Sequence, residues 1–231
     1  MSLLQKLFEI IVPEERKLSH LLALEPHSMR SLLPHSPARI KNVWILFDYH
    51  NKVIRFLIRR LKYKNNEAVR RRLAVFLYEE LLENITEISL FEGEPPIIIP
   101  MPMSPKERRA RGFNQCEMLC REIQKLSYGN LKFSYDALRK NRETSRQAEL
   151  GRALRQINIK NSISAESSLI KNKSVIVLDD VFTTGSTMNE IARTLKRAGA
   201  ERVEVLTVAR VANYVYRAEE TEISASLSIT Q

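Results

Sequence analysis

An apolar, β-branched run that ends in two carboxylates constrains this chain more than any other segment. The run Val175 to Leu178 leads directly into Asp179 and Asp180, and a turn rich in threonine, glycine and serine follows. Beyond the turn, apolar residues at three- and four-residue spacing predict an amphipathic helix over 188–198, and residues 203–208 predict another strand. Strand, helix and strand in this order predict a right-handed βαβ unit in a parallel sheet. Ligands of such sheets bind beyond the carboxyl ends of the strands.

The turn after the two carboxylates carries groups that suit a sugar phosphate. Backbone N–H groups at a helix N-terminus can hold a phosphate together with hydroxyls, and Gly185 permits a close backbone approach and a positive φ. Asp179 and Asp180 are then expected to face the ribose end, toward hydroxyls or a hydrated metal ion. A Walker loop is disfavoured because no lysine precedes the hydroxyl residues, and a single glycine disfavours a dinucleotide fingerprint. The alternative is a capped turn without a ligand. The phosphate-binding candidates are Thr183, Thr184, Gly185, Ser186 and Thr187.

Length and composition indicate one globular α/β domain, or one domain with an appendage. The 231 residues are 44% hydrophobic and 28% charged, and the net charge of +10 favours anionic partners. Two cysteines cannot form a disulfide framework or a four-cysteine zinc site, so we expect a reducing cytoplasm as the setting. We expect no membrane span and no cleavable signal, since no run of about 18 uncharged apolar residues occurs.

The rest of the chain divides into segments of different character. Residues 1–47, interrupted by prolines, predict an appendage of short helices and loops. Apolar spacing over 49–83 predicts helices with strongly basic outer faces, and residues 97–99 predict a strand buried on both faces. A polar loop follows over 102–111, and Asn114 is a candidate cap for a helix. Residues 139–160 predict a long loop, and 218–231 a disordered tail.

Here the sequence resembles a known family. VIVLDDVFTTGST resembles the phosphoribosyl diphosphate (PRPP) motif of type I phosphoribosyltransferases. IPMPMSPKERRARGFNQ, RETSRQAELGRALRQIN and that motif, in this order, resemble the ComF/GntX-like branch, which is linked to DNA uptake in competent bacteria. The earlier RRLKYKNN is similar to the family's Leu-Lys-Tyr segment. The resemblance implies a parallel sheet flanked by helices, with a helical N-terminal hood, and we expect the phosphoribosyltransferase-type domain over 48–217.

The resemblance also implies roles for individual residues. Asp179 and Asp180 would bind the ribose hydroxyls, Asp180 in part through Mg²⁺, and residues 183–187 would hold the 5′-phosphate. Arg108, Arg109 and Arg111 would contact the pyrophosphate, and the alternative for such arginines is a solvated surface. The candidates in a flexible loop that closes over PRPP are Arg146, Gln147, Arg152 and Arg155, and a basic loop without a role is the alternative there.

Two features argue against a metal site built on cysteine. Many members of the family begin with a four-cysteine zinc module, and this chain has no cysteine before Cys116, so zinc is not predicted. Cys116 and Cys120 could suggest a metal pair, but no histidine lies near them in the sequence. Buried core cysteines are therefore the favoured interpretation.

Two functions compete at this point. The first is a Mg²⁺-dependent phosphoribosyltransferase that displaces pyrophosphate from PRPP, with an acceptor that the sequence does not identify. The second is a competence factor that binds single-stranded DNA through the basic helices of 52–72, or contacts the DNA-uptake machinery, with PRPP as a regulator or not turned over. Few aromatic residues accompany the basic ones, which counts against a dedicated single-strand platform. The oligomeric state stays open, with a homodimer among the options.

Overall fold

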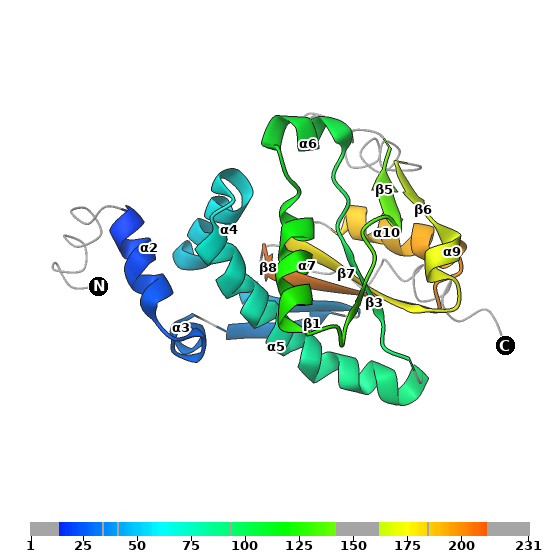
Figure 1. The fold of residues 1–231 in the computed structure, drawn as a ribbon, viewed down its shortest axis with the longest axis horizontal. Coiled ribbons are helices and arrows are strands. Elements are labelled where there is room, and N and C mark those ends of the chain that lie inside the picture. The colour runs from blue at the N-terminus through cyan, green and yellow to red at the C-terminus, as the bar shows by residue number, and fades with distance from the viewer. Residues whose placement is uncertain are drawn as a thin grey trace.

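A six-stranded sheet forms the centre of the protein (Figure 1). The computed structural model describes residues 14–33, 35–40, 42–92, 94–141, 162–183 and 185–211. The strand order is β1-β2-β8-β7-β3-β4, and every neighbouring pair is parallel except β1 with β2. The strands are β1 (His35–Ile40), β2 (Val43–Asp48), β3 (Ile97–Pro100), β4 (Lys132–Phe133), β7 (Ser174–Phe182) and β8 (Arg202–Arg210). This confirms the expected fold class, a parallel sheet flanked by helices.

The N-terminal boundary differs from the one that the sequence predicts. An appendage is expected over 1–47, yet β1 and nearly all of β2 precede residue 48 and belong to the central sheet. The prolines at positions 34 and 37 predict loops from the sequence alone. An edge strand such as β1, however, tolerates a proline. β2 is a continuous apolar run that pairs in parallel with β8, and Trp44 to Phe47 are buried. Two short helices do precede the sheet, α2 (Glu14–Ala23) and α3 (Pro26–Leu32).

Helices cover both faces of the sheet, because the apolar side chains of β7 point alternately to one face and to the other. Ile176 and Leu178 pack into one core with α4 (Lys52–Lys64), α5 (Glu67–Glu92) and α7 (Gln115–Leu126). Val175 and Val177 point to the opposite face and pack into a second core with α10 (Ser186–Arg197). Because successive side chains of a strand face opposite sides, a strand apolar at every position must be covered on both.

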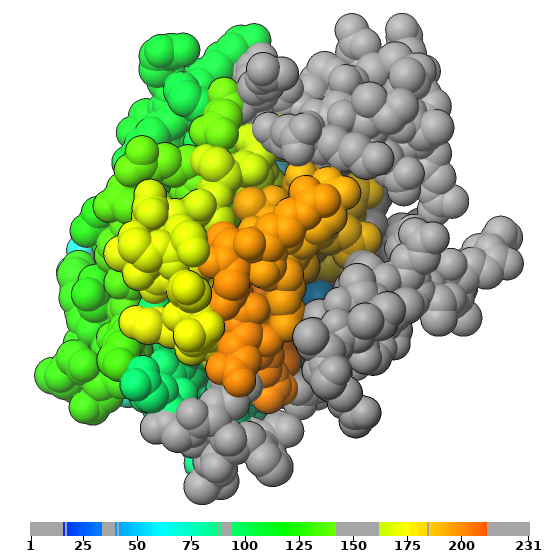
Figure 2. All heavy atoms as spheres, turned by 90° about the vertical axis from the view of Figure 1, so that its right-hand side faces the viewer, coloured from blue at the N-terminus to red at the C-terminus, as the bar shows by residue number. Residues whose placement is uncertain are grey.

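A small hairpin extends the second core. β5 (Leu138–Lys140) pairs antiparallel with β6 (Ile163–Ala165), and α9 (Ser167–Ile170) follows. Figure 2 shows the yellow segments around α9 beside the orange C-terminal elements. The hydroxyl of Ser167 donates to the carbonyl of Ala198 at 2.7 Å, which ties α9 to the end of α10.

The polar segment 102–111, expected as a loop, contains a short helix, α6 (Pro105–Arg111), at the top of Figure 1. Ser104 and Glu107 form a reciprocal capping box at its start, and Gly112 with φ of 86° ends it. Within the described residues, no helix has both the length and the apolarity needed to cross a membrane.

Candidate functional site

A cleft of about 220 Å³ lies at the carboxyl ends of β3 and β7. The two strands are neighbours in parallel register, and Met101 N–H continues the pairing by donating to Leu178 O at 2.8 Å. The N-termini of α7 and α10, the helix α6, the end of β5 and one residue of α4 complete the wall. Polar residues that line it include Lys62, Glu107, Arg111, Gln115, Lys140, Asp179, Thr183 and Thr187. A cavity therefore lies at the carboxyl ends of the strands, where parallel sheets usually bind their ligands.

The two carboxylates lie at this cleft but have different environments. Asp179 lines the cleft, and its Oδ1 accepts from the Asp180 N–H at 2.8 Å and from the Cys116 thiol at 3.6 Å. Asp180 is only 3% exposed. Its Oδ1 lies 3.0 Å from Lys62 Nζ, and its Oδ2 accepts from Gln115 Nε2 at 2.8 Å. Asp179 is thus the member of the pair that a ligand can reach.

Burial and the neighbouring charge perturb the ionisation of these groups. Burial and the Asp180 carboxylate raise the pKa of Asp179 from 3.8 to about 7. Burial alone would lower the pKa of Lys62, but attraction to Asp180 outweighs it and the pKa rises. Burial, with the nearby carboxylates, also raises the pKa of the Cys116 thiol, so this cysteine stays neutral. At neutral pH the pair therefore combines one protonatable carboxylate with one that a lysine neutralises.

The turn expected to hold a phosphate directly follows the acidic pair and contributes residues to the same cleft. Gly185, with φ of 72°, is the N-cap residue of α10, and a Cβ placed on it would lie 3.2 Å from the Phe182 ring. Thr183 and Thr187 are exposed and line the cleft. Ser186 begins α10 and is not among the lining residues, while Thr184 lies outside the described residues. A glycine in the left-handed region and a helix N-terminus meet the requirements for an anion.

The three arginines expected at pyrophosphate have different positions. Arg111 lines the cleft, donates to Gln115 Oε1 and lies over the Tyr63 ring at 5.8 Å from its centre. Arg108 is exposed and pairs with Glu117 at 3.0 Å, and Arg109 is exposed away from the cleft lining. Among the three, Arg111 alone reaches the cavity.

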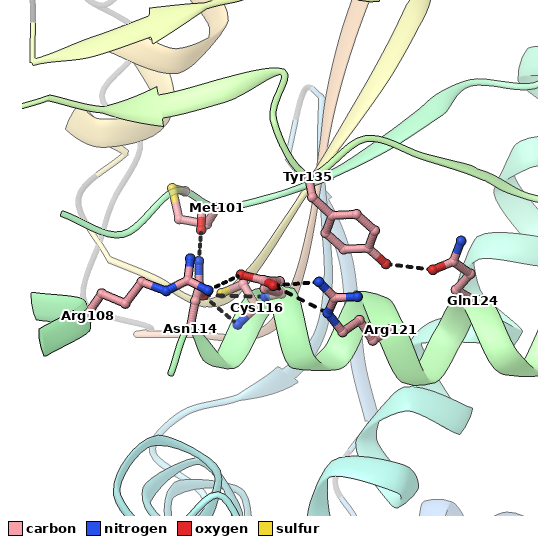
Figure 3. A network of polar contacts seen from close by, with 8 residues as sticks. Met101, Arg108, Asn114, Cys116, Arg121, Gln124 and Tyr135 are labelled. Carbon is pink, nitrogen blue, oxygen red and sulfur yellow. Dashed lines mark hydrogen bonds and ion pairs between the residues drawn. The ribbon is translucent and has the colours of Figure 1, made fainter. Parts of the chain in front are cut away.

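Asn114 holds the start of α7 against β3, as Figure 3 shows. Its side-chain oxygen accepts from the N–H groups of Cys116 at 2.9 Å and Glu117 at 3.4 Å, which confirms the expected cap. Its Nδ2 donates to Met101 O at 2.9 Å. Figure 3 also shows Arg108 and Arg121 directed toward one acceptor, which is Glu117. Because α7 also carries Gln115, this network fixes one of the partners of Asp180.

Two lysines belong to the site although the sequence interpretation does not assign them. Lys62 reaches Asp180 from α4, and the only signal for it is its place in the Leu-Lys-Tyr segment. Lys140, at the end of β5, pairs with Glu107 of α6 at 3.2 Å inside the cleft. The flexible-loop candidates Arg146, Gln147, Arg152 and Arg155 all lie outside the described residues.

The donor set does not fit a metal ion bound directly by Asp180. Both of its carboxylate oxygens already have partners, one of them an ammonium group. Across the part of the chain that the structure describes, no group of three or more His, Cys, Asp or Glu side chains could hold a metal. Mg²⁺ prefers an octahedron of oxygen ligands, and the surroundings of Asp180 do not supply them.

Comparison with known proteins defines the class. The family model of the phosphoribosyl transferase domain matches residues 118–226. The chain is 32% identical to the DNA utilization protein YhgH of Escherichia coli O6:H1, over 67% of this chain and 66% of that protein. It is 29% identical to Competence protein F of Haemophilus influenzae over 72% of each chain. For Competence protein ComFC of Streptococcus pneumoniae the identity is 27%, over 71% of this chain and 66% of that one.

The parallel sheet, the cleft at its carboxyl edge and the matched domain define a protein of the phosphoribosyltransferase fold. Within that class the chain belongs to the ComF-like family. The match to the Escherichia coli relative spans slightly less than two thirds of that protein's length.

Proposed function

We propose that this protein binds PRPP in the cleft and acts as a phosphoribosyltransferase in the use of imported DNA. The observation that carries the proposal is that Asp179, the glycine turn at the start of α10 and the cation Arg111 line one cavity. PRPP needs an acceptor for ribose hydroxyls, a site for the 5′-phosphate and a cation for pyrophosphate. The cleft supplies each of these groups. The names of the relatives, which concern competence and DNA utilization, supply the biological setting.

Each part of the ligand has a partner in this arrangement. The 5′-phosphate would lie at the N-terminus of α10, where backbone N–H groups and the helix dipole favour an anion and Thr187 offers a hydroxyl. Asp179 would accept from the ribose hydroxyls. Arg111 and Lys140 would face the pyrophosphate and stabilise the charge that develops on it as it leaves. A nucleobase is the expected class of acceptor, by resemblance to the superfamily.

Mg²⁺ enters this proposal as a partner of the pyrophosphate rather than of Asp180. A divalent ion bound to PRPP would neutralise part of the ligand's charge. The residues of the protein bind and orient the ribose and hold the 5′-phosphate. In this proposal Mg²⁺ is not a direct ligand of Asp180, because Lys62 and Gln115 already contact the two oxygens of that carboxylate.

Calorimetric titration with PRPP, with and without Mg²⁺, tests the proposal. Wild type should bind saturably, and Asp179→Asn and Thr187→Ala should weaken binding. Arg111→Ala should lose about tenfold or more, because it removes a charge-assisted contact to the anion. The matched controls are Asp136→Asn, whose side chain is 78% exposed, and Arg109→Ala on the exposed surface of α6. Absence of wild-type binding at millimolar PRPP would refute the proposal; retained binding would justify a screen of acceptors.

A second candidate function is binding of single-stranded DNA. The structure supports it less than the sequence does, because fewer basic residues are available to contact DNA. Several cations of α4 and α5 are used internally: Lys62 pairs with Asp180, Arg70 with Glu122 at 3.0 Å, and Arg72 donates to Leu22 O at 2.9 Å. The exposed cations of these two helices include Lys52, Arg55, Arg59, Lys64 and Arg71, of which Arg71 pairs with Glu67. DNA affinity that falls steeply with salt, and falls further when Arg55 and Arg59 are replaced by alanine, would favour this function.

A further inference from the structure

Lys62 is a half-buried cation that lines the cleft and that the proposed ligand contacts do not use. Its Nζ lies 3.0 Å from Asp180 Oδ1, with the Lys62 side chain 25% exposed and that of Asp180 only 5%. Lysine side chains at a helix surface ordinarily extend into water. Here the ammonium group instead turns toward the carboxyl edge of β7 and lines the cavity.

Several contacts fix the end of α4 that carries Lys62. The preceding residue, Leu61, is fully buried in the core, and Asn65 ends the helix with φ of 43°. Arg70 Nη1 donates to Asn65 Oδ1 at 2.9 Å, and Arg70 also pairs with Glu122 of α7 at 3.0 Å. The end of α4 is thus connected to α7, the helix that carries Gln115. The two partners of Asp180 are held in one frame.

Adjacent carboxylates removed from water repel one another and require neutralisation. Burial of an unpaired charge costs several kcal/mol in real proteins, so a buried carboxylate such as Asp180 needs a partner of opposite sign. Lys62 provides that charge, and Gln115 satisfies the other oxygen. An ammonium at hydrogen-bond distance and a divalent ion cannot occupy the same side of one carboxylate oxygen. The position that a metal ion held by Asp180 would need is therefore taken.

We propose that the ammonium of Lys62, in place of a metal ion held by the protein, neutralises Asp180 and positions the acidic pair for a sugar phosphate. This rests on the proposed function, because it concerns the same cleft. Lys62 acts through Asp180 and is a positioning residue. A sugar phosphate without pyrophosphate, such as ribose 5-phosphate, brings no strong metal-binding group of its own. Its binding should therefore be independent of Mg²⁺ and dependent on Lys62.

The first test measures binding of Mn²⁺, a paramagnetic substitute for Mg²⁺, to the free wild-type protein by electron paramagnetic resonance. We expect no stoichiometric binding at submillimolar Mn²⁺, and the same result for Asp180→Asn. Stoichiometric binding by wild type that Asp180→Asn abolishes would overturn the proposal. This measurement uses no sugar phosphate, so its outcome is independent of whether PRPP is a ligand.

The second test titrates ribose 5-phosphate in EDTA and again in Mg²⁺. Wild type and the matched control Lys64→Met, altered two residues further along α4, should give equal affinities in both buffers. Lys62→Met should bind about tenfold or more weakly, since Asp180 loses its counter-ion. Lys62→Arg, which keeps the charge, should lose less. Thermal melting establishes that each variant is folded.

The outcomes separate the two proposals. Loss of wild-type affinity in EDTA, or equal affinities for Lys62→Met and Lys64→Met, would refute the role of Lys62. Equal losses for Lys62→Arg and Lys62→Met would refute the role of its charge. If wild type binds neither ribose 5-phosphate nor PRPP, the proposed function fails, and the Mn²⁺ measurement alone then decides between lysine and metal at Asp180.

Discussion

Replacement of Asp179 by asparagine should stabilise the fold above pH 7 while it weakens ligand binding. Asp179 Oδ1 accepts from the Asp180 N–H at 2.8 Å and from the Cys116 thiol at 3.6 Å. Asparagine has nearly the same shape and keeps an oxygen that can accept both bonds. The substitution therefore removes the negative charge with little change in packing. Its effect on stability measures what that charge costs the folded state.

The magnitude follows from the pKa of Asp179. Burial and the charge of Asp180 raise it from 3.8 to about 7. A carboxyl group with a raised pKa binds its proton more tightly in the folded state, so its contribution to stability is full below pH 4 and is lost as pH rises through about 7. If the full difference between the unfolded and folded pKa values acted on stability, ionisation of Asp179 would lower the free energy of unfolding of the wild type by about 4 kcal/mol above pH 7. Because the side chain borders an open cleft, solvent screening reduces the cost, and we expect about 1 to 3 kcal/mol.

Urea unfolding at pH 5 and pH 8 provides the assay. At pH 5, early in that window, most of the loss has not yet occurred, so Asp179→Asn should raise the free energy of unfolding by less than half of its effect at pH 8. At pH 8 the variant should be more stable than wild type by the amount above. Asp136→Asn is the control, because that side chain is 78% exposed and should show no such dependence on pH. An equal effect of Asp179→Asn at both pH values, or destabilisation at pH 8, would contradict the reasoning.

Two further substitutions test the framework of the cleft. Asn114→Ala removes the cap of α7 and the bond to Met101 O, and should lower the free energy of unfolding by about 1 to 2 kcal/mol in chemical denaturation; an unchanged value would show that the cap is dispensable. Gly185→Ala requires a positive φ of 72° and places a methyl group 3.2 Å from the Phe182 ring, so we expect a loss of about 1 to 3 kcal/mol. Gly129→Ala is its control, since Gly129 has φ of 86° with open space around it; equal losses would mean that the ring contact contributes nothing.

The strand, turn and helix around the acidic pair could be predicted because local pattern and long-range structure agree there. Val175 to Leu178 is apolar at every position, and a strand of that kind needs cover on both faces, which α7 and α10 supply. The Asn114 cap could be predicted for the same reason, since capping depends on residues within one turn. The strand itself continues through the two carboxylates to Phe182, beyond the end that the apolar run indicates.

The pyrophosphate segment shows where composition stops being informative. Arg108, Arg109 and Arg111 look equivalent in the sequence, but α6 turns successive residues by about 100°, so they face different directions. Arg111 faces the cleft, and Arg108 faces Glu117. The sequence shows that three arginines are present, whereas the orientation of α6, which begins at the Ser104 cap, determines which arginine faces the cleft.

The position of Lys62 depends on tertiary structure that no local pattern contains. On the periodicity of α4, Lys62 follows the buried Leu61 and counts with the basic outer face. That outer face meets solvent along most of the helix, but its final turn abuts the carboxyl edge of β7, where Asp180 is buried. A lysine at such a helix end becomes an internal counter-ion. The net charge of +10 therefore overstates the cations of α4 and α5 that face solvent, because Lys62 and Arg70 are paired inside the protein. In the sequence, Lys62 and Arg70 belong to a basic segment that suggests a nucleic-acid surface. In the structure, they instead form ion pairs with Asp180 and Glu122 that stabilise the elements around the cleft.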